Sequence, residues 1–521
     1  METEQKVTVP ASRRVLRALG SVLLALGLLI GSLCFFSAWW YLRTYGNIGF
    51  DSVLFTLTGG LGGVSNDLVK SYLSGGLFPA VATAFLVYLF LFFPAEKPLW
   101  VISVKEKAIT LFPFHRIIAG VLAVVIAVSL TVSGAFQVGL PEYLIAKNQV
   151  SDLYQKEYKD PAKVNIQFPE QKRNLVYIML ESMETSYLSQ AQGGAMEKNL
   201  IPELYALAKN NLNFSHNSDV GGFREMSGGS WTIGAMVGHT AGIPLKVPEG
   251  ILDWQNGYGQ DGDFLPGVTN LTNILEQQGY YQALMVGSDA GFGGRRTYYT
   301  THGVDKIYDI YTAWRDGTVN NGYWNDWWGF EDYILFDYAK KELTKISEGD
   351  QPFAFTLLTV DTHHIGGFTC KYCENNSTES YENAISCSSK LVAEFVSWLQ
   401  QQPFYENTTV IVTGDHCSMD GGYFNRNVDE DYTRHIYNCF INSAVTTNWT
   451  SNRQFCAMDM FPTTLAAMGC TIEGNRLGLG TNLFSNIPTL MEKYGYYGLY
   501  NEVAQSSDYY KENFYTKKEE P

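Results

Sequence analysis

Three long apolar runs lie in the first quarter of the chain, at Leu19–Leu42, Leu77–Phe93 and Ile117–Phe136. Each run approaches the ~20 apolar residues that a helix needs to cross the hydrocarbon core of a membrane. We therefore predict three transmembrane helices. A cleaved signal peptide is the alternative for the first run, but that run is long for such a peptide, ends in aromatic residues and is followed by two more runs.

Basic residues flank these runs in a pattern that predicts their orientation. Arg13, Arg14 and Arg17 precede the first run. Four more basic residues lie between the second and third runs: Lys97, Lys105, Lys107 and Arg116. The positive-inside rule places both groups on the cytoplasmic side. With three crossings, everything after about Val138 is then expected on the outer face of the membrane.

Beyond a polar stretch at Pro141–Glu170, short apolar runs alternate with stretches of helical periodicity. The apolar runs are rich in strand-forming residues and predict buried strands at Asn174–Leu180, Gln282–Val286, Phe353–Thr359, Thr409–Val412 and Ile436–Ile441. The helical stretches include Leu271–Gln278, Tyr333–Ile346 and Leu391–Gln401. This alternation predicts an α/β fold, with a mostly parallel sheet sandwiched by helices on both faces.

These patterns divide the chain into four expected parts. Residues 1–138 form a membrane anchor with about three transmembrane helices, and residues 139–170 form a juxtamembrane linker. Residues 171–490 form an extracytoplasmic domain, and residues 491–521 a C-terminal tail.

Net charge and cysteine content exclude some classes of function and indicate the compartment of the domain. The formal net charge of -15 argues against a nucleic-acid partner, because binding phosphates requires clustered Lys and Arg. Seven of the eight cysteines lie from Cys370 onward, in the part expected outside the cytoplasm, where disulfides persist. Disulfides among Cys370, Cys373, Cys387 and their neighbours are favoured over structural zinc, since a second pair at zinc-site spacing is missing. The sequence leaves their connectivity open.

Polar residues with catalytic potential follow the predicted strands. Four of them come soon after a strand: Glu181, Asp289, His363 and Asp415. In parallel sheets, ligands bind at the carboxyl ends of the strands. Asp415 and His416 are adjacent and could bind a divalent metal together with Glu181. Taken alone, an Asp-His pair after a strand is more typical of a turn with a capping Asp.

A glycine-rich turn at Met226–Val237 leads into an apolar helix and places Thr232 in its first turn. Backbone N–H groups and the helix dipole favour a phosphate at that position. A threonine hydroxyl is a weak nucleophile, and coordination to a metal is one way to activate it. A simple N-cap is the alternative role for Thr232.

Two further segments could contact a phosphate group. Thr359–His364 supplies two histidines, of which one could bind a phosphate oxygen or protonate a leaving group. Asp289–Arg296 is a glycine-rich turn with two arginines, whose planar guanidinium groups suit phosphate recognition. Buried structural histidines and surface-exposed arginines are the competing interpretations.

In chain order these segments resemble the alkaline-phosphatase and sulfatase superfamily, and within it the lipoteichoic acid synthase and phosphoglycerol transferase I family. The resemblance covers nearly all of the chain after Asn174 and rests on these segments: Asn174–Glu181, Ser230–Val237, Gly242–Leu245, Thr359–His364, Gly414–His416, Phe461–Leu465 and Arg476–Gly480. The segments with Thr232 and His363 look most like phosphoglycerol transferase I, which decorates periplasmic glucans.

The resemblance implies roles for individual residues. The ligands of one divalent ion, Mn²⁺ or Mg²⁺, would be Glu181, Thr232, Asp415 and His416. Thr232 would also be the residue that is covalently modified, and Arg295 and His363 would contact the donor headgroup. Two features depart from lipoteichoic acid synthases: Gly293 stands where they carry a bulky aromatic residue, and three crossings replace their five.

The activity implied is that of a metal-dependent phosphotransferase in the bacterial inner membrane, multi-pass, with its catalytic domain on the extracytoplasmic side. Thr232 would attack phosphatidylglycerol, and a surface glycan or glycerol-phosphate polymer would accept the glycerol phosphate. Phosphoethanolamine transfer is one alternative. A sulfatase is another, although Thr232 stands where a sulfatase needs a cysteine or serine. An inactive sensor or binding domain is the alternative outside enzymes, and the complete set of expected ligands argues against it.

Overall fold

The computed structural model describes residues 11–46, 49–58, 66–93, 100–104, 107–112, 114–246, 262–324 and 329–516. The chain divides into two compact units. The apolar-helix unit comprises Met1–Thr44 and Asn66–Pro141, and the globular unit comprises Tyr45–Ser65 and Glu142–Pro521. Of the basic residues predicted to flank the apolar runs, Lys97 and Lys105 lie outside the described residues.

The apolar-helix unit contains the three long apolar helices that the sequence predicts. Helix α1 spans Ala11–Tyr45, α3 (Asn66–Tyr72) continues through a π-helical turn at Leu73–Leu77 into α4 (Phe78–Leu91), and α5 spans Arg116–Gln137. Three helical segments are long and apolar enough to cross a membrane: Val15–Tyr45, Leu68–Leu91 and Arg116–Gln137. A hairpin of β1 (Trp100–Val104) and β2 (Lys107–Phe112) lies between α4 and α5 in the sequence and was not predicted.

Glycines allow α1 and α5 to pack closely. A Cβ atom added to Gly31 would lie 2.5 Å from the carbonyl oxygen of Ala127. One added to Gly134 would lie 2.6 Å from the carbonyl oxygen of Cys34. Small residues at such crossings let two backbones approach, which is how helices associate where apolar burial gives little driving force.

The globular unit is built on a seven-stranded sheet in the order β5-β10-β9-β4-β8-β6-β7. The strands are β4 (Asn174–Leu180), β5 (Gly222–Phe223), β6 (Tyr281–Val286), β7 (Lys306–Tyr308), β8 (Phe353–Leu358), β9 (Thr408–Gly414) and β10 (Ile436–Ile441). From β9 to β7 all neighbours are parallel, whereas β10 runs antiparallel to both β9 and β5. The predicted α/β fold with a mostly parallel sheet is confirmed.

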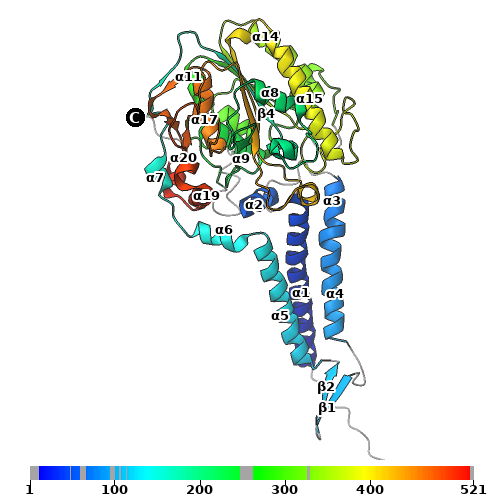
Figure 1. The fold of residues 1–521 in the computed structure, drawn as a ribbon. Coiled ribbons are helices and arrows are strands. Elements are labelled where there is room, and N and C mark those ends of the chain that lie inside the picture. Colours follow the sequence, from blue (N-terminus) through cyan, green and yellow to red (C-terminus); the bar gives the residue numbers. More distant parts are fainter. Residues whose placement is uncertain are drawn as a thin grey trace, which may run out of the picture. The chain divides into compact units, whose positions relative to one another are not determined.

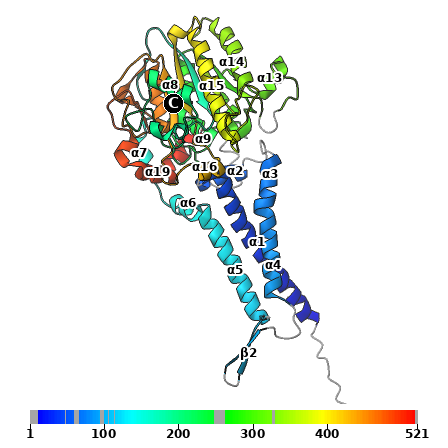
Figure 2. The ribbon, with the colours of Figure 1, turned by 45° about the vertical axis from the view of Figure 1, so that its right-hand side comes forward.

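Helices cover both faces of this sheet, so every residue of β4 is buried. Leu175, Tyr177 and Met179 pack in one core with α9 (Thr232–Ala241), α11 (Leu271–Gln277) and α17 (Ala457–Ala467). The intervening residues Val176, Ile178 and Leu180 pack in a second core with α8 (Pro202–Asn210), α14 (Asp332–Ser347) and α15 (Ser380–Gln400). Figure 1 shows α11 and α17 on one side of β4 and α14 and α15 on the other, and the turned view of Figure 2 brings α8 and α15 together.

The remaining elements are short. The helices are α2 (Phe50–Thr58), α6 (Leu140–Lys147), α7 (Leu153–Glu157), α12 (Arg295–Thr301), α13 (Ile310–Asp316), α16 (Gly421–Asn427), α18 (Leu490–Tyr494), α19 (Tyr496–Ala504) and α20 (Asp508–Phe514). The strands are β3 (Ile166–Gln167), β11 (Thr471–Ile472), β12 (Arg476–Leu477) and β13 (Gly480–Thr481). In the part expected as a C-terminal tail, α19 and α20 bury Leu499 and Tyr510 in the first of the two cores.

The central position of β9 predicts a large difference between two Val→Ala substitutions. Val412→Ala, in β9, should lower the free energy of unfolding by roughly 2 kcal/mol, since two buried carbon groups are lost and a cavity remains. Val150→Ala makes the same chemical change at a side chain that is 63% exposed, and should have little effect. Thermal melting of both variants tests this, and equal melting temperatures would contradict it.

Candidate metal centre

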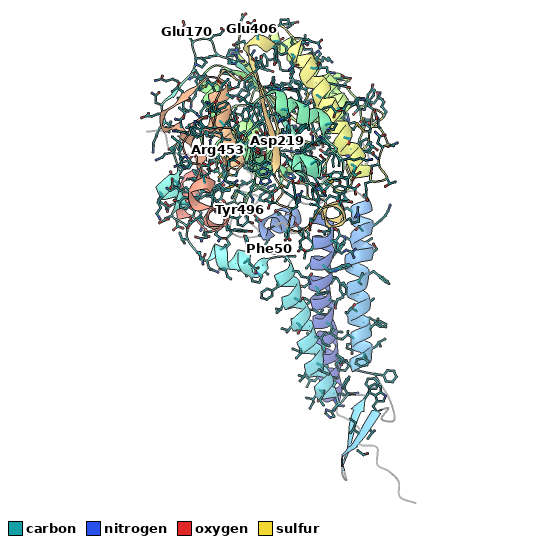
Figure 3. All side chains as sticks on the ribbon, viewed as in Figure 1. Phe50, Glu170, Asp219, Glu406, Arg453 and Tyr496 are labelled. Atoms are coloured by element: carbon teal, nitrogen blue, oxygen red, sulfur yellow. A yellow bond between two sulfur atoms is a disulfide. The ribbon has the colours of Figure 1, made fainter. Side chains whose placement is uncertain are left out.

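The candidate site lies at the carboxyl ends of two neighbouring strands. Glu181 directly follows β4 and Asp415 directly follows β9, and these strands pair in parallel. Figure 3 labels Glu170 and Glu406, which precede the two strands, at one end of the globular unit, and Phe50 at the opposite end. The carboxyl ends of the strands therefore point toward the end that holds α2.

Three potential metal ligands converge there. Ligand atoms of Glu181, Asp415 and His416 all lie within 4.8 Å of one another, and all three residues are buried. The Nε2 atom of His416 lies 3.6 Å from Glu181 Oε1 and 3.4 Å from Asp415 Oδ2. Two carboxylates and one imidazole are a donor set that divalent ions accept.

The turn after β4 is shaped around this cluster. Ser182 adopts a positive φ of 53°, which is uncommon for a residue with a side chain. Its N–H donates to Asp415 Oδ1 at 2.9 Å and its hydroxyl donates to Glu181 Oε1 at 2.8 Å. Thr362, from the loop after β8, donates its hydroxyl to the Glu181 carbonyl at 2.5 Å. Three strand ends are thus tied together, which fixes both carboxylates.

The orientation of His416 and Asp415 fits a bound cation. His416 Nδ1–H donates to the Cys417 carbonyl at 2.9 Å, which leaves the Nε2 lone pair facing the carboxylates. Asp415 Oδ1 accepts N–H bonds from Ser182 and from His416. Asp415 Oδ2 is buried and has no hydrogen-bond partner among the described residues. A buried carboxylate oxygen without a partner is costly, and a metal ion would satisfy it.

The electrostatics of the cluster lead to the same conclusion. Burial and, to a smaller extent, the neighbouring Glu181 carboxylate together raise the pKa of Asp415 to about 7. Burial opposes the charged form of His416, but the carboxylates of Asp415 and Glu181 outweigh it and raise its pKa to about 9. The two buried carboxylates therefore stabilise the protonated, positively charged form of His416. A bound divalent cation would supply that positive charge instead.

Thr232 stands beside the cluster, at the first residue of α9. Its hydroxyl donates to Glu181 Oε2 at 3.4 Å, and the residue is half-buried. Trp231 occupies the N-cap position, so Thr232 is not the N-cap that the alternative interpretation required. A group at this position faces the positive end of the helix dipole.

The two arginines after β6 differ in environment. Arg295 is 1% exposed, and its Nη2 donates to Ser288 Oγ at 3.2 Å and to the Asp289 carbonyl at 2.7 Å. Burial lowers the pKa of Arg295 to about 10, and Glu181 is the first of the carboxylates that oppose this shift. Arg296 instead forms an ion pair with Asp309. The alternative interpretation, in which both arginines are exposed at the surface, is therefore wrong for Arg295.

His363 lies half-buried on the loop that follows β8. The loop is held by Asp332, whose carboxylate accepts the N–H groups of Val360 at 2.7 Å and Asp361 at 3.1 Å. His363 Nδ1–H donates to the His364 carbonyl at 2.7 Å, and burial lowers the pKa of His363 to about 4. The imidazole is then neutral with Nε2 as an acceptor, which suits binding a hydroxyl better than donating a proton as a cation.

Sequence reasoning missed Glu225, which precedes the glycine-rich turn. Glu225 Oε2 accepts the N–H of Cys417 at 3.0 Å, next to His416, and burial raises its pKa to about 7. Its approach depends on the pairing of β5 with β10, a contact between distant parts of the chain. The only local feature of the sequence is that an acid directly precedes the glycine-rich turn, and this feature does not predict the contact with Cys417.

The structure also shows one cysteine pair in the group that follows β8. Cys373 and Cys387 form a disulfide, and the Cys370 thiol lies 3.7 Å from the sulfur of Cys373. Among the alternatives that the sequence left open, a disulfide is thus present within this group.

The donor geometry predicts pH-dependent binding of one divalent ion. Asp415 and His416 must lose their protons to bind a metal, so affinity should fall as the pH decreases below about 9, where His416 becomes protonated, and more steeply below about 7, where Asp415 is protonated as well. Asp415→Asn should lower the affinity by more than roughly 100-fold, since even outer-shell changes cost 10–100-fold. Isothermal titration with Mn²⁺ measures both effects.

A second buried acid serves as the control for that titration. Asp459 is not among the three clustered ligands, and its carboxylate accepts the N–H groups of Cys456 and Thr481 at the start of α17. Asp459→Asn should retain Mn²⁺ binding. Equal binding by the Asp415→Asn variant and the unmodified chain would contradict the assignment of the site.

Comparison with known proteins identifies similar families. The sulfatase family model matches residues 255–470, which include Arg295, His363, Asp415 and His416. Phosphoglycerol transferase I of Salmonella choleraesuis is 32% identical over 382 residues, which cover 71% of this chain and 45% of that protein. The chain therefore spans less than half the length of this curated relative.

Two solved structures are similar at lower identity. The lipoteichoic acid synthase LtaP from Listeria monocytogenes is 18% identical with a TM-score of 0.48, over 62% of this chain and 79% of that one. The lipooligosaccharide phosphoethanolamine transferase A from Neisseria meningitidis is 13% identical with a TM-score of 0.48, over 87% and 84%. The chain thus contains a sulfatase domain of the alkaline phosphatase superfamily, and it is similar to phosphoglycerol transferase I at 32% identity.

Proposed function

We propose that this chain is a membrane-anchored phosphoglycerol transferase that moves glycerol phosphate from phosphatidylglycerol to a hydroxyl of a surface glycan or glycerol-phosphate polymer. The observation that carries the proposal is the position of Thr232. Its hydroxyl lies at the start of α9 and 3.4 Å from the carboxylate of Glu181, beside Asp415 and His416. The name of the 32% identical relatives supports phosphoglycerol as the transferred group.

Glu181, Thr232, Asp415 and His416 would hold one divalent ion. Their donors are carboxylate and hydroxyl oxygens and one imidazole nitrogen, a set that suits Mn²⁺ and also Mg²⁺. Such an ion would neutralise charge that develops on the phosphate and lower the pKa of the threonine hydroxyl.

The proposed transfer has two half-reactions, in which individual residues of the chain have separate roles. In the first half-reaction the Thr232 oxygen forms a bond to phosphorus, the bond from phosphorus to the diacylglycerol oxygen breaks, and diacylglycerol leaves with the proton. In the second, an acceptor hydroxyl attacks the same phosphorus and the threonine hydroxyl is regenerated. Arg295 supplies positive charge near the phosphate, and His363 Nε2 accepts a hydrogen bond from a glycerol hydroxyl.

We also propose where the chain lies in the cell envelope. Residues 1–138 would anchor the chain by multiple passes in a bacterial inner membrane, with residues 171–490 as the catalytic domain on the extracytoplasmic side. Three helices of sufficient length and apolarity support the anchor. The Cys373–Cys387 disulfide supports an oxidising compartment for the catalytic domain. A lipid donor would explain the anchor, because a site that is tethered to the membrane meets a lipid substrate at high effective concentration.

Intact-mass analysis of the full chain in detergent, incubated with phosphatidylglycerol and Mn²⁺, tests this function. We expect a mass gain of one glycerol-phosphoryl group. Thr232→Ala should abolish the gain, because the attacking oxygen is lost, whereas Thr232→Ser keeps a hydroxyl and should retain it.

Two results would count against the proposal. A gain from phosphatidylethanolamine and none from phosphatidylglycerol would assign the chain to phosphoethanolamine transfer. Absence of any adduct with Mn²⁺ bound would remove the covalent mechanism.

A further inference from the structure

A short segment far from the catalytic domain in sequence lies against the nucleophile turn. Its described residues are 45–46 and 49–54, and it comes between the first and second helices that could span a membrane. It nevertheless belongs to the globular unit, which otherwise begins at Glu142. Figure 2 shows α2, which begins in this segment, at the end of that unit near α9 and α16, and Figure 1 also shows it near α9.

Asp51, in the first turn of α2, binds the turn that leads to Thr232. Asp51 Oδ2 accepts a hydrogen bond from the Gly228 N–H at 3.1 Å and from the Ser227 hydroxyl at 3.3 Å. The next residue, Ser52, is 1% exposed, and its hydroxyl lies 2.6 Å from that of Ser230. Both ends of the Ser227–Ser230 turn are thus bonded to α2.

This turn needs such support because of its glycines. Gly228 adopts a φ of +78°, and a Cβ atom added to it would lie 2.5 Å from the carbonyl oxygen of Leu245. Glycine at consecutive positions leaves the backbone many alternative conformations when it is not held. Without Asp51 the Gly228 N–H would lose the carboxylate that accepts it.

The same segment also contacts the other side of the site. The ring of Tyr45 lies 5.2 Å from the ring of His364, the neighbour of His363. Gly46 abuts Gly421, since a Cβ atom added to Gly421 would lie 2.1 Å from the Gly46 nitrogen. The segment therefore touches the nucleophile turn, the His363 loop and the start of α16.

We propose that Asp51 is a positioning residue for Thr232: it orders the Ser227–Ser230 turn and so sets the start of α9, and the catalytic site is complete only with this segment from between the first two apolar helices. The catalytic consequence rests on the proposed function, whereas the ordering of the turn does not. A chain that begins after the third apolar helix would lack these hydrogen bonds.

Amide hydrogen exchange of the full chain in detergent tests the ordering directly. In Asp51→Ala, peptides that contain Gly228 should exchange roughly tenfold faster, because a buried N–H loses its acceptor. Asp51→Asn keeps an oxygen that accepts the same two hydrogen bonds and should restore slow exchange. Asp152→Ala removes an acid whose side chain is 61% exposed and should leave exchange at Gly228 unchanged.

The effect on transfer separates positioning from general loss of structure. Asp51→Ala should slow formation of the Thr232 adduct by at least roughly tenfold while Mn²⁺ remains bound through Glu181, Asp415 and His416, since a misplaced nucleophile costs more in rate than in metal binding. Asp51→Asn should recover most of the rate. If Asp51→Ala does not fold, Ser52→Ala tests the same turn through the Ser230 contact.

Three results overturn the proposal: unchanged exchange at Gly228 in Asp51→Ala, unchanged adduct formation, or loss of Mn²⁺ binding together with activity. If the unmodified chain forms no adduct, the proposed function fails, and the exchange experiment still decides whether Asp51 orders the turn.

Discussion

The candidate site depends on one constraint: two carboxylates and one imidazole are held close together at the ends of adjacent parallel strands. Glu181 and Asp415 leave β4 and β9 in register, so the sheet itself forces their negative charges together in a buried space. Asp415 Oδ2 remains without a hydrogen-bond partner among the described side chains. Such an arrangement is unfavourable alone and would become favourable with a divalent cation, beside which the hydroxyl of Thr232 would lie.

Sequence patterns predicted the central sheet well, because its strands are buried on both faces. β4 and β10 match the predicted ranges to within one residue, since long apolar runs bounded by polar residues leave little choice. The same patterns placed Glu181, Asp415 and Thr232 at strand and helix ends. The antiparallel direction of β10 and the β1–β2 hairpin were not predicted, since both depend on pairing rather than on local composition.

The contacts that escaped prediction join residues distant in sequence. Ser52 meets Ser230, and Glu225 reaches Cys417 through the pairing of β5 with β10. Nothing in the local pattern around Asp51 or Glu225 marks such a contact. The segment with Asp51 follows an apolar run and was assigned with it to the anchor, yet it packs against the nucleophile turn. Residues 171–490 alone therefore lack the carboxylate that accepts the Gly228 N–H.

Localisation of the transferred group tests the central claim most directly. The full chain would be incubated with Mn²⁺ and phosphatidylglycerol that carries an isotopic label in the headgroup glycerol, then digested and examined by tandem mass spectrometry. We expect labelled glycerol phosphate on Thr232, and we expect the label to be lost when a glycan acceptor is added. Label on another residue, or an unlabelled Thr232 in a metal-loaded chain that still releases diacylglycerol, would contradict it.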